Sequence, residues 1–156
     1  MSRLIAIATL LLVAAACGSS GTGTAPSPSP STAATPSASS APALVFKLNG
    51  VGGAKAAGTI SVKAQSGSMT IELKITGLQA NSSHVSHIHI GKCAARGGIK
   101  FALNQVVADG QGDADTKTTL KAAYPPASGT WYVVVHAGPD MQGTNSTYLL
   151  CGNIFK

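Results

Sequence analysis

Residues 59–76 read TISVKAQSGSMTIELKIT and set the pattern for the rest of the chain. The apolar side chains of residues 60–64 alternate with polar neighbours, as do those of residues 69–75. A period of two is typical of a strand that buries one face. The residues between the two runs, QSGS at 65–68, are typical of a tight turn. The stretch therefore predicts an antiparallel hairpin.

Strand-like runs continue on both sides of this hairpin. They are separated by Gly, Asn, Asp and Pro at turn positions, and no stretch shows the apolar stripe of a helix. We therefore predict an all-β fold, an antiparallel sandwich or flattened barrel of about seven or eight strands. The further predicted strands are residues 44–48, 85–90, 114–120, 131–137 and 147–155.

The N-terminus has the layout of a cleaved export signal. Arg3 supplies a positive charge, residues 4–16 form an unbroken apolar run, and small residues precede Cys17. The run is too short to cross a bilayer as a helix, which needs ~20 residues. The sequence LVAAAC at 12–17 resembles a bacterial lipobox, which implies that residues 1–16 are removed and that Cys17 is lipidated. The alternative is an ordinary secretory signal with an incidental cysteine.

The segment that follows, residues 18–43, consists of Gly, Ser, Thr, Ala and Pro. Such a composition cannot bury enough apolar surface to fold. We therefore expect a signal peptide at 1–16, a lipidated cysteine with a disordered linker at 17–43, and one folded domain at 44–156. The expected location is the bacterial cell envelope, outside the cytoplasm, with the protein anchored to the membrane through the lipid on Cys17.

The charge balance argues against one class of partner. Without Arg3, ten Lys and Arg residues stand against five Asp and Glu, a net charge of +5. The basic residues are scattered and aromatic residues are few, whereas a nucleic-acid surface would cluster the positive charge. We therefore expect no nucleic-acid binding, and we interpret the positive charge as a solvated surface.

All four histidines lie in two places, HVSHIHI at 84–90 and the end of WYVVVH at 131–136. On an extended strand, His87 and His89 point to the same side, ~7 Å apart. Two such imidazoles can chelate one ion if a third ligand arrives from another strand, and His136 is the candidate for it. Spacing alone leaves open that these side chains are merely exposed or hydrogen-bonded.

The residues around the histidines resemble the copper/zinc superoxide dismutase family. The resemblance spans nearly the whole folded domain and implies a Greek-key, immunoglobulin-like sandwich. It also implies that His87, His89 and His136 are copper ligands and that His84 has a structural role. The motifs that carry it, in the order of the family, are GL at 77–78, HVSHIHIGKC at 84–93, VVVH at 133–136 and CGNI at 151–154.

Other parts of the dismutase pattern are missing. No histidine occurs between His89 and His136, where the family has the ligand that bridges copper to zinc and two further zinc ligands. The family's catalytic arginine, three residues before the cysteine of the last strand, is replaced by Tyr148. We therefore expect no bridged copper–zinc site and assign no catalytic residue. The expectation is a single copper ion, with zinc as the alternative, and at most reduced activity on superoxide.

The same motifs resemble the chordin-type domain, abbreviated CHRD. Its pattern H-x-H-x-G, followed by a Gly-centred turn and a T-x-T-L strand, is similar to residues 87–91, 109–112 and 116–120. This resemblance implies the same sandwich but leaves a second function open. In that function the domain is a non-catalytic binding or structural module without metal, and the histidines brace loops for an unknown protein partner.

The cysteines fit an exported protein. Once Cys17 is lipidated, Cys93 and Cys151 are the only thiols left, and the compartment is oxidising. We therefore expect a disulfide between them, and the dismutase family likewise has a disulfide cysteine in its last strand. The alternative is that one of the two is a soft metal ligand beside the histidines.

Overall fold

The computed structural model describes residues 42–155, which are almost wholly strands, turns and loops. The expected signal peptide, Cys17 and most of the expected linker lie outside these residues. Within them, no helix is long and apolar enough to cross a membrane. The elements are β1 (Leu44–Gly50), β2 (Ala57–Gln65), β3 (Ser68–Thr76), β4 (Ser83–His84), β5 (Ser86–Ile90), β6 (Ile99–Ala102), β7 (Val106–Val107), β8 (Ala114–Leu120), β9 (Trp131–His136), the 3-10 turn η1 (Gly143–Ser146) and β10 (Tyr148–Asn153).

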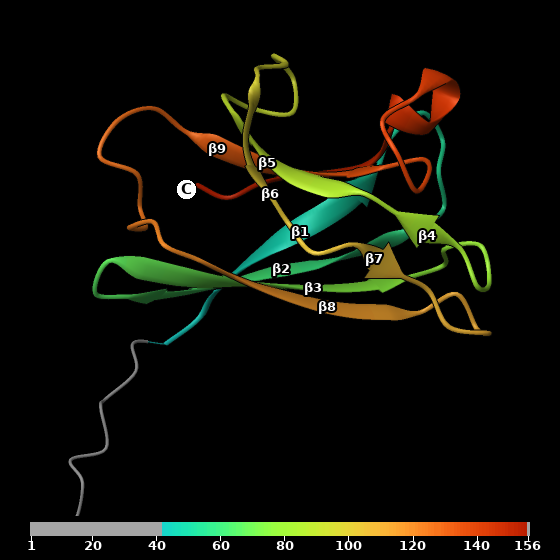
Figure 1. Cartoon of the computed structure of the whole chain (residues 1–156), viewed down its shortest axis with the longest axis horizontal. Coiled ribbons are helices and arrows are strands. Elements are labelled where there is room, and N and C mark those ends of the chain that lie inside the picture. Colours follow the sequence, from blue (N-terminus) through green and yellow to red (C-terminus); the bar gives the residue numbers. More distant parts are fainter. Residues whose placement is uncertain (1–41, 156) are drawn as a thin grey trace, which may run out of the picture. The chain divides into compact units, whose positions relative to one another are not determined.

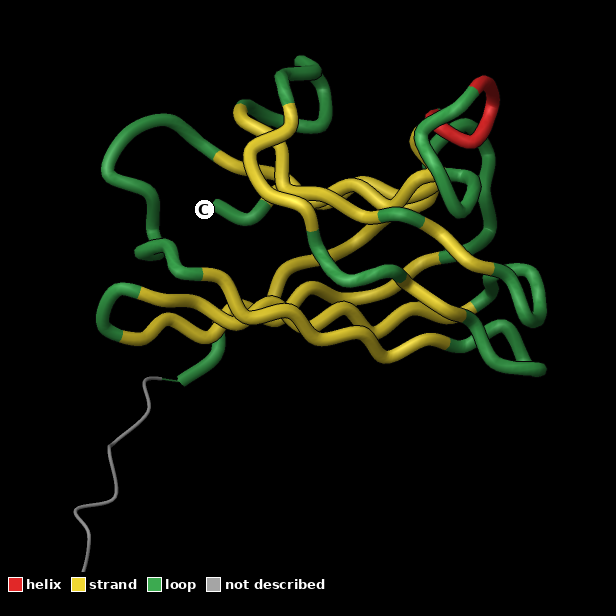
Figure 2. The backbone as a smooth tube through the Cα atoms, viewed as in Figure 1, coloured by secondary structure: helices red, strands yellow, loops and turns green. Residues whose placement is uncertain are grey.

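Eight strands form one continuous sheet in the order β6-β5-β9-β10-β1-β2-β3-β8, and β4 pairs with β7. The sheet folds over on itself, so that β5, β6 and β9 lie in one layer and β2, β3 and β8 in the other (Figures 1 and 2). β1 joins the layers because its first five residues pair with β2 and its last two with β10. The predicted all-β, antiparallel sandwich is confirmed.

The hairpin that the sequence predicts is β2 and β3. The two strands pair from Ala57 opposite Thr76 to Gln65 opposite Ser68, and Gly67 in the turn adopts a φ of 70°, which favours glycine. Their alternate side chains are buried between the layers, as the period of two requires. These core residues, each at most 1% exposed, are Ile60, Val62, Met69, Ile71, Leu73 and Ile75.

Three strands were not predicted, and the ends of others differ. β6 has four residues, and β4 and β7 have two each, too few to show a period in the sequence. The predicted strand 147–155 is shorter in the structure, because η1 precedes it and the chain leaves the sheet after Asn153. The predicted strand 85–90 is β5, which begins at Ser86.

β9 is buried on both faces, which explains its unbroken apolar sequence. Trp131, Val133 and Val135 pack into the core between the layers. Tyr132 and Val134 point the other way and form a smaller cluster with Cys151 of β10. We call this side of β5, β9 and β10 the outer face. His136 continues the outward series, because side chains two residues apart share a face.

The expected disulfide is present and helps to cover the outer face. Cys93 and Cys151 are bonded, with their Cα atoms 6.0 Å apart. The bond ties residues 91–98, the loop between β5 and β6, to β10. We call this segment the 91–98 loop. Because both sulfur atoms are in the disulfide, neither is a thiolate ligand, and the alternative role of these cysteines is wrong for this structure.

Candidate metal centre

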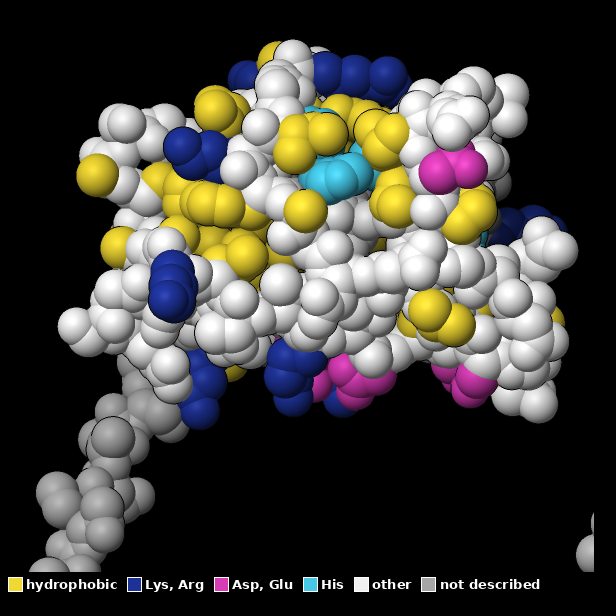
Figure 3. Space-filling view, in the orientation of Figure 1, with side chains coloured by type: hydrophobic (Ala, Val, Ile, Leu, Met, Phe, Trp, Pro, Cys, Tyr) yellow, Lys and Arg dark blue, Asp and Glu magenta, His cyan; other side chains and the backbone are white. Residues whose placement is uncertain are grey.

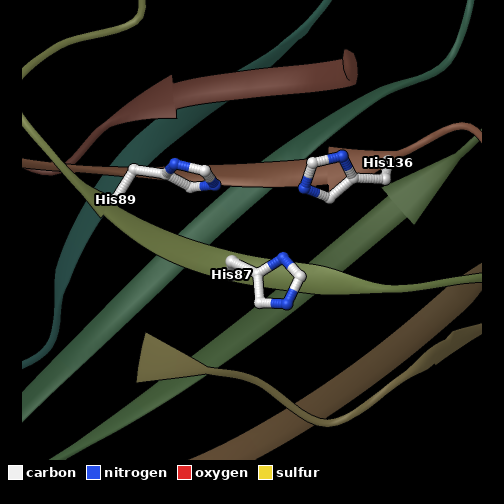
Figure 4. A group of neighbouring side chains, drawn as sticks. All are labelled: His87, His89 and His136. Atoms are coloured by element: carbon white, nitrogen blue, oxygen red, sulfur yellow. The ribbon is translucent and has the colours of Figure 1, made fainter. Parts of the chain in front are cut away.

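Three histidines meet on the outer face. His87 and His89 project from β5, and His136 projects from the end of β9 (Figure 4). β5 and β9 are neighbours, with His87 opposite Val134 and His89 opposite Tyr132. His136 lies two residues beyond Val134 and therefore points to the same side. One ring nitrogen from each histidine lies within 4.8 Å of the other two.

Hydrogen bonds decide which nitrogens are free. His89 donates from Nδ1 to the carbonyl oxygen of Gly97 at 3.0 Å, and His136 donates from Nδ1 to that of Ser146 at 2.7 Å. A carbonyl oxygen only accepts, so each neutral ring keeps a bare lone pair on Nε2. These two Nε2 atoms and Nδ1 of His87 are buried without a hydrogen-bond partner. Buried polar atoms without partners are costly, and here a metal ion would satisfy all three.

The protonation state also fits a metal ligand. Burial, followed by the neighbouring His136 and His89, lowers the pKa of His87 to about 4. Burial also lowers the pKa of His136. No ion pair among residues 42–155 involves a histidine, so no carboxylate favours the charged form. His87 and His136 are therefore neutral near pH 7, which is the form that binds metal ions.

His84 lies nearby but does not join the cluster. Its Nδ1 donates to the carbonyl oxygen of His136 at 2.9 Å, and its Nε2 lies 2.8 Å from the hydroxyl of Ser82. Both ring nitrogens are therefore occupied, and the side chain is buried. His84 holds the backbone of His136 in place, which is a bracing role.

A tyrosine and a glycine support His89, and neither has a signal in the sequence. The ring of Tyr132 stacks on His89 with centroids 5.1 Å apart. Gly97 accepts from His89 and donates its N–H to the Tyr132 hydroxyl at 2.9 Å. A Cβ at Gly97 would lie 1.9 Å from the carbonyl oxygen of Ile90, so only glycine fits there. The 91–98 loop thus fixes the ring of a ligand candidate through its backbone.

Tyr148, at the start of β10, lies beside the cluster. Its ring centroid is 5.4 Å from that of His136 and 5.7 Å from that of His89. Burial, helped by the hydroxyl of Tyr132 at 3.1 Å, raises the pKa of Tyr148 to about 12, so it is a neutral phenol. The guanidinium of Arg96 lies over the Tyr148 ring, with Cζ 4.2 Å from the ring centroid.

The cluster opens to solvent. His87 is partly exposed, whereas His89 and His136 are buried. The space-filling view shows a histidine surface surrounded by apolar side chains, with Lys and Arg side chains along the nearby upper edge (Figure 3). A small ligand can therefore reach the cluster from one side.

Comparisons with known proteins agree with this fold. The family model described as CHRD domain matches residues 28–141, which contain all four histidines. A crystal structure of a SOD-like protein from Bacillus subtilis is similar at 17% identity and a TM-score of 0.55, covering 71% of this chain and 97% of that one. A double mutant of a SOD-like protein from the same organism, with two histidines introduced, gives 16% identity, a TM-score of 0.55, and 72% and 97% coverage. No curated protein sequence matches.

Proposed function

This chain belongs to the CHRD domain family, and we propose that it is a bacterial envelope lipoprotein whose sandwich binds one copper ion through His87, His89 and His136. One observation carries the metal site. Each of the three imidazoles has one buried nitrogen without a hydrogen-bond partner, and the three rings bring one nitrogen each within 4.8 Å of the others. Histidines that only braced loops, as in the metal-free alternative, would use these atoms in hydrogen bonds, as His84 does.

The donor set favours copper over zinc. Neutral imidazoles suit both metals, and a given nitrogen site holds Cu²⁺ more tightly than Zn²⁺. Copper, when bound, would supply one-electron chemistry with a small oxidant such as superoxide. The chain's own contribution is to orient the imidazoles through Gly97 and Ser146 and to keep His87 neutral.

We expect any superoxide dismutation to be slow. Fast turnover needs a group that gives up and regains a proton near neutral pH. The aromatic neighbour Tyr148 has a pKa of about 12 and does not exchange its proton readily at pH 7. Copper binding or storage is therefore the main proposed role, and dismutation is secondary.

Metal analysis of the domain at residues 43–156 tests the metal site. After loading with equal amounts of Cu²⁺ and Zn²⁺ and removal of excess, we expect one copper per chain and little zinc. The His136→Ala variant should retain much less copper. His84→Ala is the matched control, because it removes a nearby histidine whose nitrogens are already occupied. Micromolar or weaker binding, or equal copper in both variants, would contradict the proposal.

Membrane anchoring is the second part of the proposal and rests on the sequence around Cys17. In the bacterial host, the intact protein should be found in the membrane fraction, with the mass of a diacyl or triacyl group on its first mature residue. The Cys17→Ser variant should lose that mass and leave the membrane fraction. An unmodified Cys17 in the mature protein would refute the anchor and leave the metal site untouched.

A further inference from the structure

Replacement of the dismutase arginine by Tyr148 does not leave the candidate metal centre without a nearby cation. Arg96, from the 91–98 loop, lies over the Tyr148 ring with Cζ 4.2 Å from the centroid. This is a cation–π contact. The same ring lies 5.4 Å from His136 and 5.7 Å from His89. The Tyr148 ring thus contacts Arg96 of the 91–98 loop and also lies beside two ligand candidates, His89 of β5 and His136 of β9.

We propose that Arg96 and the metal centre together form a binding subsite for a small monoanion. The anion would take the coordination position that three histidines leave open, and Arg96 would supply positive charge beside it. The chemical class is a compact anion of one charge, such as azide, a halide or superoxide. This inference rests on the proposed metal site and adds a ligand class and a residue to it.

The 91–98 loop holds Arg96 in a defined place. On one side, Cys93 is bonded to Cys151, and its N–H donates to the side-chain oxygen of Asn153 at 2.9 Å. On the other side, Gly97 is fixed by hydrogen bonds to Tyr132 and His89. Arg96 therefore lies between two anchored residues, so its exposed side chain starts from a fixed backbone.

Within the part of the chain that the structure describes, no acidic side chain forms an ion pair with Arg96. Among residues 42–155, every ion pair lies on β3 and β8 in the other layer. Three neutral imidazoles also leave the full charge of a bound metal ion uncompensated. The outer face near the cluster is therefore positive once a metal is bound, which favours an anion. The ion-paired side chains are Lys74, Lys117, Glu72 and Asp115.

The distances allow a measurable effect. Arg96 Cζ lies 4.2 Å from the Tyr148 ring centroid, and that centroid lies 5.7 Å from the centroid of His89. The distance from Arg96 Cζ to the His89 ring centroid is therefore no longer than one Debye length at 0.1 M salt, ~10 Å. At that range, two unit charges near a protein surface interact strongly enough to change a dissociation constant roughly three- to tenfold. Added salt should reduce the effect, because Arg96 is exposed.

Azide titration of the Cu²⁺-loaded chain tests the subsite, with azide binding followed by its charge-transfer absorption. We expect Arg96→Gln to bind copper as the parent does and azide roughly three- to tenfold more weakly, with a smaller difference at high salt. Lys100→Gln is the matched control, because it removes another cation from the β5–β6 hairpin. The ammonium of Lys100 lies over the ring of Phe101, which packs against the main core and not against the histidines. It should bind azide like the parent.

Tyr148 is a positioning residue in this account. Tyr148→Phe keeps the ring under Arg96 and should keep the azide affinity, whereas Tyr148→Leu should weaken azide binding at equal copper occupancy. Equal azide affinity in Arg96→Gln and the parent, an equal loss in Lys100→Gln, or equal affinity in the two Tyr148 variants would overturn the subsite alone. A parent chain that binds no copper would refute the proposed metal site and this inference with it.

Discussion

Replacing Gly97 with alanine should loosen both the fold and the candidate metal centre. The added Cβ would lie 1.9 Å from the carbonyl oxygen of Ile90, which is backbone and cannot swing away. The 91–98 loop must therefore move. That movement breaks the bond from His89 Nδ1 to the Gly97 carbonyl, at 3.0 Å, and the bond from Gly97 N–H to the Tyr132 hydroxyl, at 2.9 Å.

The expected magnitudes follow from these two bonds. Each contributes ~1 kcal/mol net, so the free energy of unfolding of the metal-free domain should fall by ~2 kcal/mol. For a domain of this size, that lowers Tm by roughly 8 °C. Copper affinity should fall by roughly 10- to 100-fold, as when the hydrogen-bond partner of a ligating histidine is removed.

Thermal unfolding followed by circular dichroism, together with competitive copper titration, measures both effects. Gly98→Ala is the control, because a Cβ at Gly98 meets no atom within 4 Å and the residue is not in the positive-φ region. It should change Tm and copper affinity little. The reasoning is refuted if Gly97→Ala and Gly98→Ala have the same Tm and the same copper affinity.

Three further outcomes are expected. The disulfide closes a loop between residues that are 58 positions apart in the sequence. Removing it with Cys93→Ser and Cys151→Ser should therefore lower the free energy of unfolding, measured by urea titration, by ~4 kcal/mol. The metal-free domain should keep a constant Tm from pH 7 to about 9 and lose stability from pH 6.5 down to about 4, because the unfolded chain takes up a proton that native His87, with its pKa lowered to about 4, does not. A His87→Gln variant should show a shallower decline over that range, and an identical decline would contradict the pKa assignment. His84→Ala should lower the free energy of unfolding by ~1–3 kcal/mol, since it leaves the buried carbonyl of His136 without its donor, while metal analysis still finds one copper per chain.

The sequence predicts the strands that alternate clearly and misses those that do not. β8 begins and ends where its alternation predicts, at Ala114 and Leu120, and the β2–β3 hairpin has the predicted turn. The missed strands β4, β6 and β7 are defined by pairing with other strands, and segments of two or four residues are too short to show a period in the sequence. The signal peptide, the linker and the lipid on Cys17 lie outside the described residues and stay predictions.

The candidate metal centre, too, was predicted only in part. Strand period and family resemblance place His87, His89 and His136 together, because side chains two residues apart share a face. The groups that orient them could not be predicted. Gly97 acts through its carbonyl oxygen, which carries no side-chain signal, and Arg96 reaches Tyr148 only through the fold of the 91–98 loop.

Electron paramagnetic resonance of the Cu²⁺-loaded chain tests the central claim most directly. The account predicts hyperfine coupling to three imidazole nitrogens, two bound through Nε2 from His89 and His136 and one through Nδ1 from His87. His136→Gln should remove one of these couplings, and His84→Gln should remove none. A copper spectrum that shows fewer than three imidazole nitrogens in the parent, or that is unchanged in His136→Gln, would contradict the three-histidine site.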